Sequence, residues 1–174
     1  MLVWLGAAEI FDAPPAPAPI ADPDLPLYTI LVPLYQEANV LASLVAALRA
    51  LDYPRDKLDI KLVVEADDEE TRAAIRMLDL DPSGHIIVVP PSNPRTKPKA
   101  LNYALPFVRG EFVVVYDAED IPNPDQLRLA VAAFAADPGL DCLQAELLVD
   151  NARENLLTGL FAGEYAGQFG LMMP

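Results

Sequence analysis

Apolar residues along this chain fall into short continuous runs, separated by segments whose apolar positions recur with helical spacing. The continuous runs lie at residues 28–32, 60–64, 86–89 and 112–116, and their length and composition predict buried strands. A fifth strand is predicted at residues 140–149. We therefore expect each run to contribute one strand to a common sheet.

The segments between these runs predict helices. Around residues 41–48, one helical face is formed by Leu41, Leu44, Val45 and Leu48. A second helix is predicted at residues 68–80, with Ala73, Met77 and Leu80 on its apolar side. Further helices are predicted at residues 98–108 and 154–173.

Another helix is predicted to begin at Asn123, where four consecutive residues form a recognisable start signal. Asn123 is expected to be the N-cap, Pro124 the first helical residue and Asp125 an acid in the first turn. Gln126 would then close a capping box by reaching back to the N-cap.

Strands and helices that alternate in this way predict an α/β fold. The sheet is expected to be mainly parallel with helices on both faces. In such sheets, ligands bind outside the carboxyl ends of the strands. That edge is where we expect functional residues to gather.

Composition narrows the possible partners. The formal net charge is −14, from 26 acidic and 12 basic residues, so the surface repels polyanions and nucleic acid is not an expected partner. Cys142 is the only cysteine, which excludes a disulfide within the chain and any Cys-based zinc motif.

The first 27 residues differ from the rest of the chain. Their apolar opening ends at Glu9, so neither a signal peptide nor a complete membrane span is predicted there. Proline, alanine and aspartate then dominate residues 12–26, a composition that favours an extended linker or a disordered terminus. We therefore expect an apolar start and linker at residues 1–27 and a folded domain at 28–174.

Two predicted strands end in clusters of acids, at residues 65–68 and 117–120. Asp67 or Asp68 is suited to capping the helix that follows. The acids at residues 117–120 are not needed as a helix cap if Asn123 caps the helix that follows them.

Crowded carboxylates repel one another unless a cation neutralises them, and Mn²⁺ or Mg²⁺ prefers oxygen ligands. Asp117 and Glu119 are therefore candidate metal ligands, with a solvated acidic loop as the alternative.

A basic segment lies between the two acid clusters. It holds Arg95, Lys97 and Lys99 just before a predicted helix, with Thr96 as a plausible cap. Helix N-termini favour anions, so this segment is a candidate for facing a diphosphate; an ordinary basic loop is the alternative.

Three motifs of this chain together resemble family 2 glycosyltransferases. Residues 29–37 resemble the family's "(V/I)P-x-(Y)NE" opening, residues 97–105 its "KAxxLNxAL" segment and residues 116–120 its "DADD" stretch, in the same order and spacing. The resemblance is strongest to the membrane-associated, cellulose-synthase-like branch. It implies a Rossmann-like GT-A nucleotide-sugar-binding domain, truncated to the N-terminal part of the catalytic domain.

The resemblance also implies roles for the donor-side residues. Pro33 and Glu37 would line the nucleoside pocket, and Lys97 would lie near the diphosphate. Glu65, where the family often has Asp, would approach the base, with Asp67 as a second candidate.

The remaining implied roles concern the metal and the acceptor. Asp117 and Glu119 match the acids of the family's DxD motif, which would contact the donor sugar or ribose, through Asp117, and the metal. Glu119 is one methylene longer than the commoner Asp. Gln144 matches a position near the acceptor region. The family's catalytic base and "QxxRW" segment are expected beyond Pro174, so the chain alone is expected to bind a donor without transferring sugar.

By the same resemblance, the full-length protein is an inverting, metal-dependent hexosyltransferase that uses a nucleotide sugar, with a UDP-sugar as the first candidate. The acceptor would be a saccharide or a lipid-linked molecule, at the cytoplasmic face of the inner membrane. A non-catalytic nucleotide-sugar-binding module or pseudoenzyme is the alternative. A nicotinamide-dependent dehydrogenase is disfavoured because no GxGxxG follows the first strand.

Overall fold

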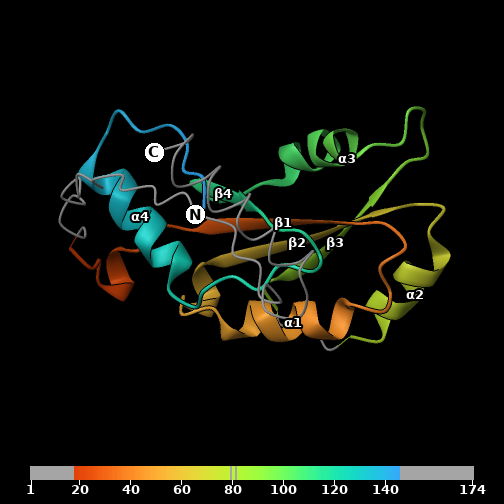
Figure 1. The fold of residues 1–174 in the computed structure, drawn as a ribbon, viewed down its shortest axis with the longest axis horizontal. Helices are drawn as coiled ribbons and strands as arrows, with labels where there is room; N and C mark the ends of the chain where they lie inside the picture. The colour runs from red at the N-terminus through yellow and green to blue at the C-terminus, as the bar shows by residue number, and fades with distance from the viewer. Residues whose placement is uncertain (1–17, 79, 81, 146–174) are drawn as a thin grey trace, which may run out of the picture. The chain divides into compact units, whose positions relative to one another are not determined.

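The computed structural model describes residues 18–78, 80 and 82–145. Its sheet has four parallel strands in the order β3-β2-β1-β4 (Figure 1). The strands are β1 (Tyr28–Leu34), β2 (Leu58–Glu65), β3 (Gly84–Val89) and β4 (Phe112–Val115). All four runs predicted as strands are confirmed, and so is their parallel arrangement.

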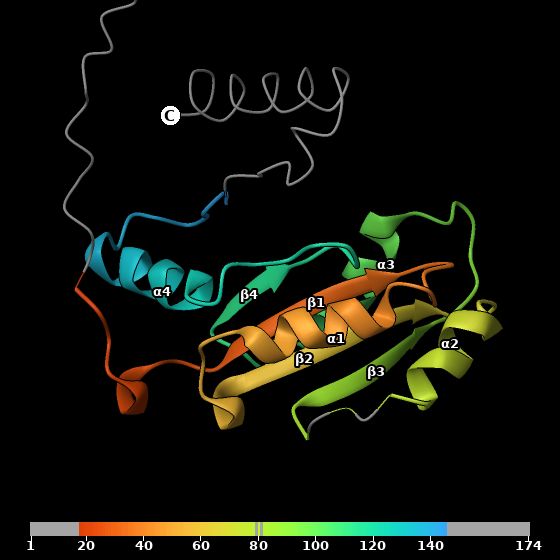
Figure 2. The same ribbon diagram turned by 60° about the horizontal axis from the view of Figure 1, so that its bottom comes forward.

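Helices connect the strands and cover both faces of the sheet. The α-helices are α1 (Leu41–Ala50), α2 (Glu69–Arg76), α3 (Lys97–Ala104) and α4 (Gln126–Ala136). Short 3-10 helices are η1 (Asp22–Asp24), η2 (Arg55–Lys57) and η3 (Leu105–Phe107). In Figures 1 and 2, α1 and α3 lie on opposite sides of the strands.

Alternate side chains of the central strands divide the core into two layers. On one face, even-numbered residues of β1 and β2 pack with apolar residues of α1, α2 and α4. On the other face, Leu31 and Val63 pack with Ala100 and Ala104 of α3. Every residue of β2 is buried, as expected for a strand covered on both faces.

Two helices end earlier than their patterns predicted. α3 gives way to the 3-10 helix η3, which contains Pro106, because proline has no N–H for the next α-helical hydrogen bond. The second helix ends at Arg76, and its buried residues are Thr71 and Ile75. Placing Met77 on the apolar side was therefore wrong, since its side chain is 86% exposed.

The predicted capping box at Asn123 is also wrong. Helix α4 begins at Gln126, and Asp125 occupies the N-cap position without a side-chain cap bond. Tertiary contacts explain the shift: the carbonyl of Pro124 accepts a 2.7 Å bond from the backbone of Asp52, and the side chain of Gln126 accepts one from the hydroxyl of Tyr116.

Part of the expected linker packs against the domain. Leu25 is buried in the larger core layer, and the Tyr53 hydroxyl donates to the carbonyl of Pro26. The ammonium of Lys57 donates to three carbonyls around η1, those of Asp22, Pro23 and Leu25.

The chain divides into two compact units, residues 1–137 and 138–174. Of the strand predicted at residues 140–149, the described part, 140–145, forms no strand, and residues 141–145 are exposed. The rest of that prediction and the helix at 154–173 lie outside the described residues. Among the helices that are described, none has the length and apolar character needed to cross a membrane.

A buried polar cluster lies near the amino ends of the central strands. The carboxylate of Asp59, with no exposed surface, accepts hydrogen bonds from Thr29 at 3.0 Å and from Arg109 at 2.6 and 3.0 Å, and pairs with Lys61 at 2.8 Å. Gly110 is required here, because a Cβ atom would come within 2.5 Å of the Thr29 backbone.

Candidate functional site

A cleft of about 300 Å³ opens at the carboxyl edge of the sheet. Its walls come from the end of β1 and the loop after it, the end of β2, the start of α3 and the loop after β4. Six of the residues predicted to be functional line it, namely Pro33, Glu37, Glu65, Lys97, Asp117 and Glu119.

The position of the cleft follows from the strand order. β1 lies between β2 and β4, and the chain leaves β1 toward α1 on one face but reaches β4 from α3 on the other. Such a switch point leaves a crevice between neighbouring loops, where open α/β sheets bind ligands.

The turn after β1 is held by the start of α2. Gln36 has a φ of 57°, and its N–H donates to Oδ2 of Asp68 at 2.6 Å. The other carboxylate oxygen of Asp68 accepts from Thr71, which confirms Asp68 as the helix cap. The hydroxyl of Thr71 in turn accepts from the N–H of Glu37 at 3.1 Å, which fixes the backbone of Glu37 at the cleft.

Negative charge accumulates on one side of the cleft. Burial raises the pKa of Glu37, and the hydrogen bond from the Tyr35 N–H opposes this effect. The charges of Glu119 and Asp117 raise the pKa further, against a smaller lowering effect of Lys97. The carboxylate of Glu37 is therefore close enough to those of Glu119 and Asp117 to be repelled by them, and a cation bound nearby would relieve this repulsion.

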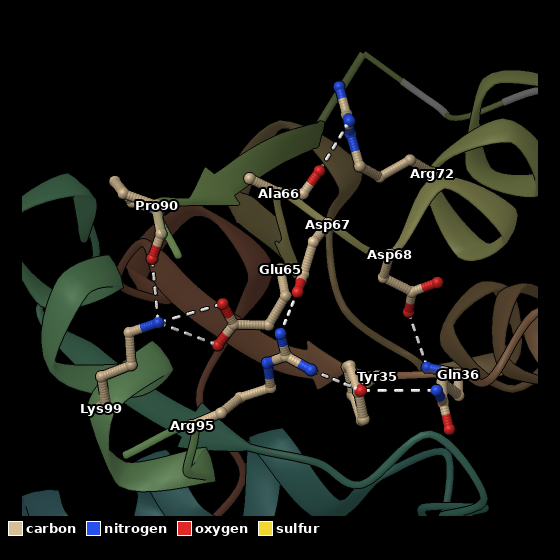
Figure 3. A network of polar contacts seen from close by, with 10 residues as sticks. All are labelled: Tyr35, Gln36, Glu65, Ala66, Asp67, Asp68, Arg72, Pro90, Arg95 and Lys99. Carbon is tan, nitrogen blue, oxygen red and sulfur yellow. Dashed lines mark hydrogen bonds and ion pairs between the residues drawn. The ribbon is translucent and has the colours of Figure 1, made fainter. Parts of the chain in front are cut away.

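Glu65 lines the cleft and is almost completely buried. Both of its carboxylate oxygens accept from the ammonium of Lys99, at 3.0 and 3.1 Å (Figure 3). Lys99 also donates to the carbonyl of Pro90 at 2.9 Å, so its three N–H groups are engaged. The sequence indicated Lys99 only as one of three basic residues in this segment. No feature of the sequence predicted that Glu65 is its partner.

Arg95 joins three loops at the rim. Its guanidinium binds the carboxylate of Asp67, donates to the Tyr35 hydroxyl at 2.5 Å and lies 4.8 Å from the centre of the Tyr35 ring (Figure 3). Both Arg95 and Tyr35 line the cleft, whereas Asp67 does not. Tyr35 was not among the predicted site residues, although an aromatic residue directly after a strand is a usable signal.

Lys97, the first residue of α3, binds the carboxylate of Asp117. Thr96 caps this helix by accepting from the N–H of Lys99, as predicted. After β4, the carboxylate of Asp120 accepts from the N–H of Asp117 at 2.7 Å and closes the turn. Asp120 therefore has a structural role in this turn, whereas no structural role was expected for this acid cluster from the sequence.

Asp117 and Glu119 supply the oxygen donors that a hard divalent cation prefers. Within the described residues, no three acidic, histidine or cysteine side chains are arranged to hold a metal by themselves. Mg²⁺ is commonly held by one or two carboxylates together with substrate phosphates, so a pair of acids that lines this cleft fits this chemistry.

Gln144, the predicted acceptor-region residue, lies in the second unit. Its side chain is exposed and donates to the carbonyl of Ala145 at 3.2 Å.

The fold and the acid-lined cleft define a GT-A-like domain, and comparisons with known proteins agree. Residues 23–173 match the model of "Glycosyltransferase like family 2". The chain belongs to this family of glycosyltransferases. The predicted family and fold are thereby confirmed.

Curated relatives include two cellulose synthases. "Cellulose synthase 2" of Novacetimonas hansenii is 30% identical over 152 residues, which cover 85% of this chain and 9% of that protein. The UDP-forming cellulose synthase catalytic subunit of Pseudomonas fluorescens is 28% identical over 120 residues, 68% of this chain and 16% of that protein. The chain thus spans a small part of these relatives.

Solved structures share the fold. The mannosyltransferase PcManGT from Pyrobaculum calidifontis, in complex with GDP-Man and Mn²⁺, superposes with a TM-score of 0.60 at 34% identity, over 78% of this chain and 40% of that one. Residues 1–349 of S. aureus TarS superpose with a TM-score of 0.56 at 20% identity, over 72% of this chain and 43% of that one.

Proposed function

We propose that this chain is the donor-binding part of an inverting glycosyltransferase that transfers a hexose from a nucleotide sugar to an acceptor hydroxyl. The observation that carries the proposal is the cleft itself, where Glu37, Glu65, Lys97, Asp117 and Glu119 converge at the switch point of the sheet. Membership of the family supports a transferase rather than a binding module.

Within this proposal, Pro33 and Glu37 line the nucleoside pocket and Glu65 approaches the base. Lys97 binds the diphosphate, aided by its place at the N-terminus of α3. Asp67 supports the donor indirectly, by holding Arg95 at the rim. Gln144 serves the acceptor.

Asp117 and Glu119 would hold Mn²⁺ or Mg²⁺. When bound, such an ion supplies Lewis-acid stabilisation of the departing diphosphate. This chain's own part is to supply the carboxylates, to keep the turn after β4 closed through Asp120, and to place Lys97 beside them.

A UDP-sugar remains the first candidate donor, supported by the UDP-forming cellulose synthase relative. The mannosyltransferase crystallised with GDP-Man makes a GDP-sugar the specific competitor. For the full-length protein we propose a saccharide or lipid-linked acceptor and association with the cytoplasmic face of the inner membrane, in line with the cellulose synthase relatives.

Calorimetric titration of UDP and GDP, each with Mn²⁺ or with EDTA, tests the proposal. We expect one of the two nucleotides to bind in Mn²⁺ and to bind at least about tenfold more weakly in EDTA, because the acidic cleft repels an unbridged diphosphate. Asp117→Ala and Glu119→Ala should lose most of the affinity in Mn²⁺, but neither should lose affinity in EDTA.

Glu70→Gln is the matched control, since Glu70 is an exposed acid of α2 outside the cleft. It should bind nucleotide as the wild type does. Equal affinities of the wild type, Asp117→Ala and Glu119→Ala in Mn²⁺ would contradict the metal assignment.

A further inference from the structure

The basic segment at residues 95–99 keeps its cations in ion pairs with carboxylates from two different strand ends. The pairs are Arg95 with Asp67, Lys97 with Asp117, and Lys99 with Glu65. Figure 3 shows the first and third of these pairs at the end of β2. The Lys97 pair differs from them because Asp117 also belongs to the proposed metal site.

Asp117 therefore has two competing partners. The ammonium of Lys97 lies on Oδ1 of this carboxylate. A divalent cation bound to the same carboxylate would be repelled by the ammonium at contact distance. Lys97 and Asp117 are 45% and 52% exposed, and exposed ion pairs of this kind are weak enough for a stronger ligand to displace them.

We propose that Lys97 is exchanged between Asp117 and the donor diphosphate: binding of the divalent cation at Asp117 releases the ammonium, which then binds phosphate. This inference rests on the proposed function. It assigns Lys97 two successive partners and makes the metal a prerequisite for its contact with the donor.

The exchange couples the two ligands. Without metal, a diphosphate has to break the Lys97 pair and meets the carboxylates of Glu37, Asp117 and Glu119. With metal, the pair is already broken and most of the acids' negative charge is compensated. Metal and nucleotide therefore strengthen each other's binding by the same factor.

Lys97→Met gives the sharpest test, because it should change the affinities for the two ligands in opposite directions. Mn²⁺ alone, followed by the electron paramagnetic resonance signal of the free ion, should bind about twofold to fivefold more tightly to the variant, the range expected from loss of an exposed ion pair. The affinity for UDP or GDP in Mn²⁺ should fall, and the affinity for the nucleoside should change less.

Asp117→Asn provides the reciprocal test. It frees Lys97 without metal, so nucleotide affinity in EDTA should rise about twofold or more. Lys97→Met combined with Asp117→Asn should lose that gain. Circular dichroism of each variant checks that the fold is retained, as the exposure of both side chains leads us to expect.

Arg95→Gln separates the exchange from general electrostatics, because it removes a positive charge from the same segment and leaves Asp117 paired. Its Mn²⁺ affinity should stay close to the wild-type value. The exchange is overturned if Lys97→Met binds Mn²⁺ no more tightly than the wild type, or if Arg95→Gln gains as much. Failure of the wild type to bind either nucleotide in Mn²⁺ would instead reject the proposed function.

Discussion

Single residues of the basic segment 95–99 have different duties, although in the sequence only the family resemblance, through Lys97, distinguished one of them from the others. Lys97 and Arg95 line the cleft, where their charges are partly exposed. Lys99 instead points its ammonium at the buried carboxylate of Glu65 and the carbonyl of Pro90. One lysine is therefore structural, and a lysine two residues away can meet a ligand.

Lys99→Met should lower the free energy of unfolding by about 1 to 3 kcal/mol, because it leaves the buried carboxylate of Glu65 without its cation. The double variant Lys99→Met/Glu65→Gln should recover part of this loss, since the uncompensated charge is removed. Urea unfolding of the two variants and the wild type measures both effects. A double variant no more stable than Lys99→Met would show that lost packing, and not charge, is the cause.

The loops and helix starts that surround the cleft are linked to each other. Asp68 caps α2 and also binds the N–H of Gln36 in the turn after β1, so one side chain orders two elements. Asn123, by contrast, looked like a cap in the sequence but makes no cap bond at the start of α4.

Substitution of the two residues tests this difference. Asp68→Ala should cost about 1 to 3 kcal/mol, the loss of a helix cap plus a second charge-assisted hydrogen bond. Asn123→Ala should change stability by less than about 0.5 kcal/mol, as expected for an exposed residue without such a role. Thermal and urea unfolding measure both changes in stability. If Asn123→Ala lost as much stability as Asp68→Ala, Asn123 would be a helix cap after all.

At the scale of the whole molecule, stability depends on a polar cluster buried near the amino ends of the central strands. Burial alone would raise the pKa of Asp59, but hydrogen bonds from Arg109, Lys61 and Thr29 outweigh it and lower the pKa below its usual value. Asp68 shows the same direction: burial opposes the hydrogen bonds from Gln36 and Thr71, which prevail.

A lowered pKa in the folded state contributes stability above the unfolded-state pKa, and this contribution is lost as the pH falls through the folded value. The free energy of unfolding should therefore decrease below about pH 4, the ordinary range of carboxyl groups. Asp59→Asn should show a shallower decrease than the wild type when urea unfolding is repeated from pH 5 to pH 2. The exposed acid Asp56, changed to Asn, is the control and should keep the wild-type slope. Equal slopes for Asp59→Asn and the wild type would contradict the role of the cluster.

The hydrophobic pattern alone was sufficient to predict the four strands of the sheet, their parallel arrangement and the helices on both faces, although the described part of the strand expected at residues 140–149 forms no strand. Buried strands require continuous apolar runs, and amphipathic helices require a period of 3.6 residues, so these elements are encoded locally. The same pattern located the cleft, because strand ends of a parallel sheet share one edge. Motif order then indicated six of the residues that line it.

Partnership between distant residues was decided by the tertiary structure alone. The binding of Lys99 to Glu65, of Arg95 to Asp67 and of Lys97 to Asp117 depends on which strand ends become neighbours. The start of α4 was moved by contacts from Asp52 and Tyr116, which no local capping rule contains. The residue type at a position determines the charge and length of its side chain. Which group that side chain binds depends on how segments far apart in the chain pack together.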